Sequence, residues 1–149
     1  MIFTGGTKLA TVVLLVGILS VVMGGFFIYE GVAKGNLITA SMELEKAKYN
    51  SADGTIDGVI NTSQEAAAMA AVLREHRFTQ YGYYSDLKKD DPKRDQILKA
   101  MTMENSLNLA QLGYGLTDVV KGTGVFMAMI GLTFIVGAAS AFRAGARVS

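Results

Sequence analysis

Two long runs without a charged residue dominate the pattern of hydrophobic and polar positions along the chain. The first extends from Leu9 to Tyr29 and the second from Gly122 to Phe142, and each contains 21 residues. A helix of that length is about 31 Å long, which is enough to cross the hydrocarbon core of a bilayer. Neither run has the polar face that a helix in a small soluble bundle requires. We therefore predict two transmembrane helices.

The first run has a second interpretation as a signal peptide, because the small residues Gly31 and Ala33 follow it closely. The apolar core of a signal peptide is about 7 to 15 residues long. The run from Leu9 to Tyr29 is longer than that. We therefore expect an uncleaved membrane anchor.

The distribution of charge predicts an orientation. All 13 carboxylates lie between Glu30 and Asp118. Outside the connecting segment from Glu30 to Lys121, the charged side chains are all basic: Lys8, Arg143 and Arg147. Short basic flanks stay on the cytoplasmic side of bacterial membranes, whereas a long loop crosses largely regardless of its charge. We expect cytoplasmic termini at residues 1–8 and 143–149, and an extracytoplasmic domain at residues 30–121 in the plasma membrane of a bacterium.

The first part of the connecting domain combines a helical pattern with a turn-rich segment. Between Asn36 and Tyr49, apolar or small residues recur at helical spacing: Leu37, Ala40, Leu44 and Ala47. The segment from Asn50 to Asn61 contains two Asp-Gly pairs, which favour tight turns. We predict a helix that prolongs the first span, followed by a loop or a small hairpin.

Two start signals predict the remaining helices. Thr62 and Glu65 form a capping-box pattern before an alanine-rich stretch, so we expect a helix from about Ser63 to Thr79. Asp91 and Pro92 match the N-cap and first position of another helix, which leads without a breaker toward the second span. The predicted fold class is an all-α membrane protein, with two transmembrane helices flanking an extracytoplasmic helical domain.

Composition excludes several classes of function. Only 18% of the residues are charged, below the roughly 25% of soluble domains, and the net charge of +1 offers no basic field for nucleic acid. With no cysteine and one histidine, disulfides, structural zinc and iron–sulfur clusters are excluded. A di-iron bundle needs a Glu-x-x-His motif from each of two helices. Copper bound by methionine pairs is a weaker alternative to simple packing. We expect no metal and no cofactor.

A group of polar residues is the main candidate cluster in the connecting domain. Its members are Glu75, His76, Arg77, Glu104 and Asn105. His76 is predicted to share a face with Leu73, and Glu104 interrupts an apolar stripe formed by Leu98, Met101, Leu109 and Leu112. A carboxylate inside such a stripe needs a partner, so we predict that Glu104 pairs with Arg77 or His76. The functional alternative is a pH-sensitive or ligand-contacting site at His76.

Two further sets of residues are candidates for contacts. An aromatic group after the capped helix could cover a partner or reach lipid headgroups, or it could pack its own turn: Phe78, Tyr81, Tyr83 and Tyr84. Small residues in the spans let helices approach closely: Gly17, Ser20, Gly24, Gly131, Gly137 and Ala141. The spans carry no ionisable residue, which argues against an ion or proton pathway.

Three segments resemble a loose set of small two-span bacterial membrane proteins of actinobacterial and related type. They are Arg74–Arg77, Tyr81–Tyr83 and Glu104–Ala110. The resemblance covers most of the chain. It implies a bacterial membrane protein and carries no catalytic activity with it.

Three functions remain open at this stage. The first is a structural or accessory membrane subunit that packs into a homo-oligomer or a larger complex with other membrane subunits. The second is an extracytoplasmic sensor or small-ligand-binding module that signals through a partner, since few residues follow the second span. The third, an enzyme of the outer face using Glu75, His76 and Glu104, has the least support. We therefore expect a protein that is not an enzyme.

Overall fold

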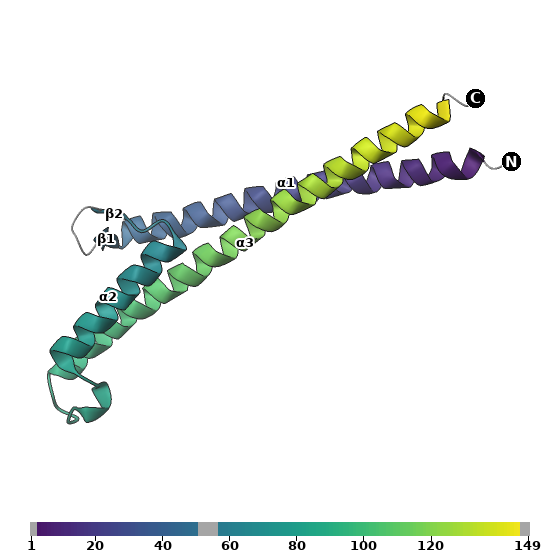
Figure 1. Ribbon diagram of the computed structural model, residues 1–149. Helices are drawn as coiled ribbons and strands as arrows, with labels where there is room; N and C mark the ends of the chain where they lie inside the picture. The colour runs from purple at the N-terminus through teal and green to yellow at the C-terminus, as the bar shows by residue number, and fades with distance from the viewer. Residues whose placement is uncertain (1–2, 51–56, 147–149) are drawn as a thin grey trace. The chain divides into compact units, whose positions relative to one another are not determined.

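The computed structural model describes residues 3–50 and 57–146 (Figure 1). The predicted turn at Asp53 and Gly54, and the basic residue Arg147, lie outside the described residues. The described elements are helix α1 (Phe3–Leu44), strands β1 (Lys48–Asn50) and β2 (Asp57–Val59), helix α2 (Ser63–Tyr81), the short 3-10 helix η1 (Tyr84–Asp86) and helix α3 (Lys93–Ala146). The fold is almost wholly helical, as predicted.

Both long helices are apolar enough to cross a membrane. The spans predicted at residues 9–29 and 122–142 fall within α1 and α3. In the most apolar window of each helix only 11% of the residues are buried within the chain. A core helix of a soluble protein would be mostly buried, so this exposure favours contact with lipid over burial in a soluble core.

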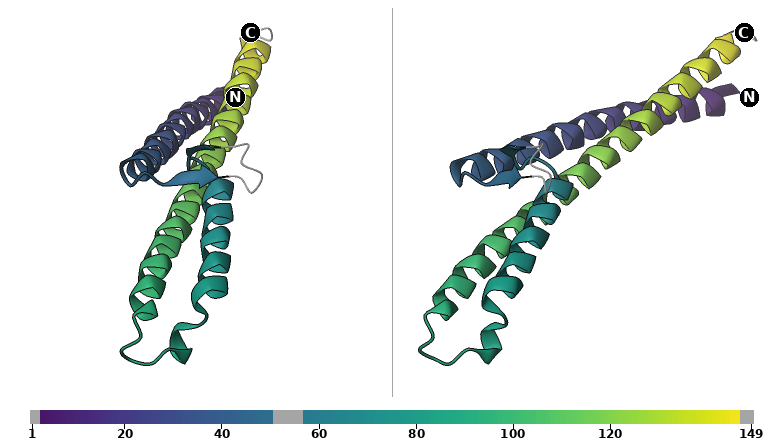
Figure 2. Two further views of the ribbon diagram at one scale, coloured as in Figure 1. Left: turned by 90° about the vertical axis from the view of Figure 1, so that its left-hand side faces the viewer. Right: turned by 60° about the vertical axis from the view of Figure 1, so that its left-hand side comes forward.

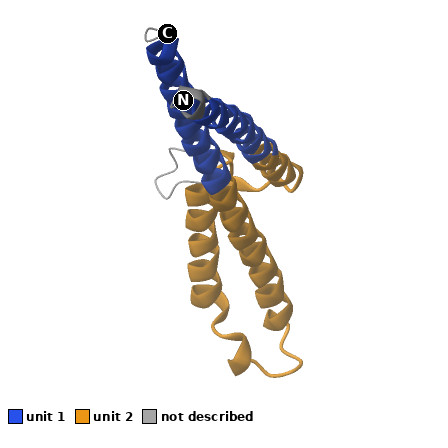
Figure 3. Ribbon diagram, turned by 90° about the vertical axis from the view of Figure 1, so that its right-hand side faces the viewer, with its two compact units in different colours: residues 1–33, 118–149 blue, residues 34–117 orange. Residues whose placement is uncertain are grey.

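The chain divides into two compact units, coloured separately in Figure 3: unit 1 comprises residues 1–33 and 118–149, and unit 2 comprises residues 34–117. Unit 1 contains the two apolar segments. They run antiparallel, because Gly17 lies against Gly131 while Gly24 lies against Gly124. Unit 2 contains the end of α1, the strand pair, α2 and the first part of α3.

The structure corrects the predicted end of the first helix. The helix ends at Leu44, not at Tyr49, and the chain then enters β1. The amide of Ala47 donates to the carbonyl of Met42 over 2.9 Å. The amide of Lys46 donates to the carbonyl of Glu43 over 3.0 Å. Lys46 has a φ of 53°. Together these features form a Schellman motif, with lysine at the left-handed position that glycine usually occupies.

The strand pair fits the predicted small hairpin, but Asp57 and Gly58, which were predicted to favour a turn, lie within β2. β1 and β2 are antiparallel, and Lys48 pairs with Val59, Tyr49 with Gly58, and Asn50 with Asp57. Figure 2 shows the pair beside the start of α2. Ile60 follows β2 directly and is fully buried. The hairpin thereby delivers an apolar side chain to the core of unit 2.

Both predicted helix starts are confirmed. The hydroxyl of Thr62 accepts from the amide of Glu65 over 3.2 Å, and the Glu65 carboxylate accepts from the amide of Thr62 over 3.2 Å. α2 therefore begins with a complete capping box. At the start of α3, the Asp91 carboxylate accepts from the amide of Lys93 over 2.9 Å, as an N-cap does.

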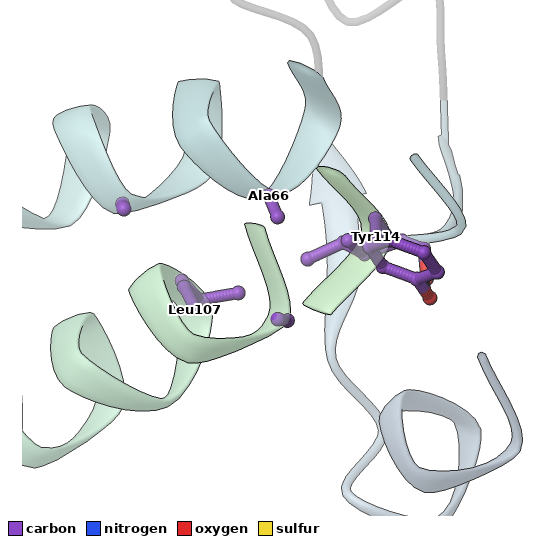
Figure 4. Packing of buried hydrophobic residues seen from close by; sticks show 6 residues of the cluster. Ala66, Leu107 and Tyr114 are labelled. Carbon is purple, nitrogen blue, oxygen red and sulfur yellow. Dashed lines mark hydrogen bonds between the residues drawn. The ribbon is translucent and has the colours of Figure 1, made fainter. Parts of the chain in front are cut away.

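The core of unit 2 forms where α2, α3 and the residue after the hairpin meet. Figure 4 shows Ala66 of α2 facing Leu107 and Tyr114 of α3. The buried cluster consists of Ile60, Ala66, Ala70, Leu107, Ala110 and Tyr114. Ile38 and Met42 from the end of α1 pack against it. Small side chains on α2 allow its backbone to approach α3, which is why alanines occupy that contact.

This core leaves the predicted apolar stripes largely exposed. Leu37 is 62% exposed and Leu44 is 85% exposed on α1, while Leu109 and Leu112 are each 69% exposed on α3. In the sequence these positions mark the apolar stripes of two predicted helices. They stay exposed because the alanines of α2 pack on a different face of α3, and Ile38 and Met42 are the residues of α1 that pack against the core.

Candidate functional site

The buried polar cluster of unit 2 is built around Glu104 on α3. Its carboxylate accepts a hydrogen bond from Nη2 of Arg77 over 3.1 Å and another from Nε of Arg74 over 2.5 Å. Glu104 and Arg77 are both more than 90% buried, whereas about half of the Arg74 side chain is exposed. The predicted pairing of Glu104 with Arg77 is confirmed, and Arg74 is a second partner that the sequence did not indicate.

Electrostatics keep this carboxylate ionised. Burial raises the pKa of Glu104, but the hydrogen bonds and positive charges of Arg74 and Arg77 outweigh burial and lower the pKa below its usual value. The Nε of Arg77 has no hydrogen-bond partner in the described part of the chain. The Arg77 guanidinium also lies 4.2 Å from the centre of the Phe78 ring, a cation–π distance.

The other predicted members of the cluster lie outside it. Glu75, His76 and Asn105 are all exposed. The expectation that His76 shares the apolar face of its helix is wrong. α2 turns Ala66, Ala70 and Arg77 toward the core, and His76 is one residue, about 100° of rotation, away from Arg77. The cluster is therefore an ion pair between two helices rather than a histidine site.

The aromatic group after α2 divides into two contacts. The rings of Phe78 and Tyr83 are 4.9 Å apart, and Tyr83 is 62% exposed. The guanidinium of Arg94 lies 4.0 Å from the centre of the Tyr84 ring, and Tyr81 is half-buried. These contacts fit the alternative in which the turn is packed by its own aromatics. Tyr83 is the most exposed member of the group and the one that a partner could reach most readily.

Unit 1 contains a contact seam made of small residues. On α1, buried small residues recur every seven positions at Ala10, Gly17, Gly24 and Gly31, and on α3 the same period gives Gly124, Gly131 and Ala138. A Cβ on Gly131 would lie 2.6 Å from the carbonyl oxygen of Gly17, so the two backbones are in direct contact there. A seven-residue period is that of a left-handed helix pair.

The predicted small residues divide accordingly. Gly17, Gly24 and Gly131 belong to the seam, and Ser20 is half-buried. A Cβ at Gly137 would meet nothing within 4 Å, and Ala141 is exposed. Gly137 and Ala141 therefore do not contribute to the contact between the two spans. Ala10, Gly124 and Ala138 were not predicted, although their seven-residue spacing from Gly17 and Gly131 is present in the sequence.

Unit 2 carries an exposed face on α3, which we call the outer stripe. Its members follow one another at alternating intervals of four and three residues: Leu98, Thr102, Asn105, Leu109, Leu112 and Leu116. Leu109, Leu112 and Leu116 are 65% to 69% exposed. Alternating intervals of three and four residues describe the contact positions of a coiled coil. The outer stripe thus has the pattern of a helix interface without a partner among the described residues.

No family model, curated protein or solved structure matches this chain.

Proposed function

We propose that the protein is a structural or accessory subunit of a bacterial plasma membrane, and that it assembles with further copies of itself through the outer stripe of α3. The observation that supports this most directly is the exposure of Leu109, Leu112 and Leu116 outside the predicted spans. Three leucines in register on one helix face are costly to leave in water, since each exposes most of an apolar side chain. A partner helix removes that cost.

A second copy fits this face better than an unrelated helix. Two copies inserted in one membrane with the same orientation present parallel α3 helices, and in a two-fold dimer each residue meets its own counterpart. Asn105 would then face Asn105, and asparagine at a contact position of a coiled coil specifies register and oligomeric state. The antiparallel seam of unit 1 is consistent with both termini lying on one side of the membrane, which we propose is the cytoplasm.

Cysteine cross-linking tests self-association, because the chain has no native cysteine. In the full-length protein, Asn105→Cys and Leu112→Cys should form disulfide-linked dimers on mild oxidation. Lys99→Cys, also exposed on α3 but off the outer stripe, is the matched control and should stay monomeric. Equal cross-linking at all three positions, or a monomer in native mass measurement from gentle detergent, would reject the proposal.

Native mass also separates the two forms of the subunit hypothesis. A complex of identical chains supports the homo-oligomer, and Leu109→Glu with Leu112→Glu should dissociate it. A complex that contains other membrane chains, and that the same variants dissociate, would instead make the outer stripe a contact to a different subunit. The orientation is tested separately with a membrane-impermeant thiol reagent, which should label Lys89→Cys but not Arg143→Cys in intact cells.

The alternative role, an extracytoplasmic sensor or small-ligand-binding module, has one observation in its favour. Unit 2 contains a largely apolar pocket whose lining also includes charged residues. A pocket does not by itself make a sensor, because a signal also requires an output partner.

A further inference from the structure

Unit 2 contains a pocket of about 580 Å³, bounded by the end of α1, the hairpin, α2 and α3. This volume lies in the range of about 300 to 1,000 Å³ that is usual for small-molecule sites. Packed protein interiors leave few voids larger than a water molecule, so the elements around this space do not close on one another. The pocket therefore has room for a bound small molecule.

Methionines from three helices line this pocket. Met42 comes from α1, Met69 from α2 and Met103 from α3. Methionine side chains are flexible and polarisable, and surfaces built from them adapt to apolar ligands of varied shape. The rest of the apolar lining is formed by Ala47, Ile60, Leu73 and Leu107.

The charged residues of the lining, as far as the structure describes it, leave no excess of free charge. Lys46 and Glu45 are neighbours of opposite sign in this lining. Lys48 also lines the pocket, but it has an interaction of its own. An ion that entered the pocket would lose its water without gaining an unengaged counter-charge, which is costly. The lining therefore favours an uncharged ligand.

The two hydroxyl groups of the lining are also engaged. Thr102 donates to the carbonyl of Leu98 over 2.9 Å. Ser106 donates to the carbonyl of Thr102 over 3.1 Å. Neither hydroxyl has a proton left to offer a ligand, because a hydroxyl group donates only one hydrogen bond. Recognition in this pocket must therefore come mainly from apolar contact.

We propose that the pocket of unit 2 binds an uncharged apolar molecule, held by the methionine-rich lining without recognition of a polar group. The affinity comes from apolar surface that leaves water, and it grows with the number of methylene groups that are buried. Decanol, an uncharged chain of ten carbons, is a suitable probe. The proposal goes beyond self-association and does not need it, because every lining residue belongs to one copy of unit 2.

The experiment uses the full-length protein in phosphatidylcholine nanodiscs, with its methionine methyl groups labelled with carbon-13 and observed by NMR. Affinity is expressed against the free aqueous concentration of the probe. Titration with decanol should shift the signals of Met42, Met69 and Met103 to saturation. Met101, which is exposed on α3 outside the lining, should keep its signal. Equal shifts at Met101 and at the pocket methionines, or no saturable shift at the pocket methionines, would overturn the proposal.

Two comparisons of probes test how the ligand is held. Octanol is shorter by two methylene groups and should bind about fifteenfold more weakly than decanol, because the affinity depends on buried apolar surface. Decanoate and decylammonium should bind no more tightly than decanol, since the lining offers neither sign of charge in excess. Tighter binding of either ion, or equal affinity for octanol and decanol, would overturn the assignment of an uncharged apolar ligand.

Substitutions at Ser106 test the location of the site. Ser106→Phe should bind decanol about tenfold more weakly, because the added ring takes the place of about two methylene groups of the buried chain. Ser106→Ala removes only the hydroxyl group and should bind decanol like the wild type. Gln96→Phe adds the same ring at an exposed position of α3 outside the lining, and it should also bind decanol like the wild type. Equal affinity of Ser106→Phe and wild type, or an equal loss in Ser106→Phe and Gln96→Phe, would reject this pocket as the site.

The double variant Leu109→Glu with Leu112→Glu separates this proposal from self-association. It changes two leucines of the outer stripe and keeps every residue of the pocket lining. It should bind decanol like the wild type, whether or not the copies associate. Loss of decanol binding in this variant would place the site between two copies, and the proposal of a pocket within one copy would be wrong.

Discussion

Gly24 and Gly124 approach each other so closely that neither position has room for a side chain. A Cβ on Gly24 would lie 2.6 Å from the carbonyl oxygen of Gly124. In the same way, a Cβ on Gly124 would lie 2.6 Å from the carbonyl oxygen of Gly24. The relationship is reciprocal, so the two backbones pack directly on each other. Lipid chains are as apolar as the helix surfaces, and close backbone packing is therefore what holds such a pair together.

Alanine at either glycine of this pair should separate the spans. Gly24→Ala and Gly124→Ala each place a methyl group against backbone that cannot give way, and overpacking of this kind costs about 1 to 3 kcal/mol. The measurement is the yield of disulfide between Ala10→Cys and Ala138→Cys, two buried residues that the seven-residue period brings into register. Both glycine variants should lower this yield.

Gly25→Ala is the matched control, because a Cβ at Gly25 would meet nothing within 4 Å. It should leave the disulfide yield unchanged. If Gly24→Ala and Gly25→Ala behave alike, the seam of small residues does not hold the spans together.

Glu104→Gln should destabilise unit 2 at neutral pH. The change removes the negative charge that Arg77 requires in its buried position, and loss of one partner from a buried ion pair costs about 3 kcal/mol. The measurement is the midpoint of thermal unfolding in detergent. Glu75→Gln, which neutralises an exposed carboxylate on α2, should leave the midpoint nearly unchanged.

The same pair predicts a pH dependence. Because the pKa of Glu104 is lowered in the folded state, its contribution to stability is present above the pKa of the unfolded chain and is lost as the pH falls through the folded value. The unfolding midpoints of wild type and Glu104→Gln should therefore begin to converge once the pH falls below the ordinary glutamate pKa of about 4.3, and converge fully only below the lowered pKa of the folded state. A difference between them that stays constant from pH 7 to pH 3 would contradict this role for the ionised carboxylate.

The parts of the fold that could be predicted are those fixed by local rules. The capping box at Thr62 and Glu65 and the N-cap at Asp91 depend only on neighbouring residues, and both are present. The two apolar helices depend only on length and composition. The pairing of Glu104 with Arg77 was predicted correctly, but from the wrong face of the helix. Leu98, Leu109 and Leu112 are exposed, and Glu104 lies on the buried face of α3 with Leu107 and Ala110.

The parts of the fold that could not be predicted depend on which face of a helix contacts which neighbouring element. A leucine in a helix pattern favours burial, but the sequence does not show whether the same chain or another molecule buries it. Leu109 and Leu112 remain exposed within this chain. Alanine and glycine occupy the closest helix contacts because they are small, and their sequence positions do not stand out as large apolar residues do. Ala66 in the core of unit 2 and Gly131 in the seam of unit 1 are examples. The end of α1 was missed because Lys46 occupies a position where glycine would have signalled the stop.

Lys46→Gly should raise stability. Glycine adopts the left-handed conformation without steric cost, whereas a residue with a Cβ pays about 1 kcal/mol there. Part of this gain is offset because glycine has more freedom in the unfolded chain. We expect a net stabilisation of up to about 1 kcal/mol, measured as a higher unfolding midpoint.

Lys48→Gly serves as the comparison, because it removes the same charge from an extended strand position. It should lower the midpoint, since glycine weakens a strand. If both glycine variants shift the midpoint in the same direction, the conformation of Lys46 does not account for the effect.

Tyr114→Phe should weaken the junction of α1, the hairpin and α3. The buried Tyr114 hydroxyl donates to the carbonyl of Ile60 over 2.9 Å and lies 3.0 Å from the hydroxyl of Thr39. Phenylalanine keeps the ring but leaves both oxygens without this partner, and an unsatisfied buried acceptor costs about 1 to 3 kcal/mol. Amide hydrogen exchange should quicken at Ile60 and along β2, with a lower overall unfolding midpoint.

Tyr83→Phe is the appropriate control, because Tyr83 is 62% exposed and its ring contact with Phe78 survives the change. It should not alter exchange at Ile60. If Tyr114→Phe also leaves exchange in β2 unaltered, the hydroxyl does not tie the hairpin to α3. The apolar contacts of the ring with the core would then hold the junction by themselves.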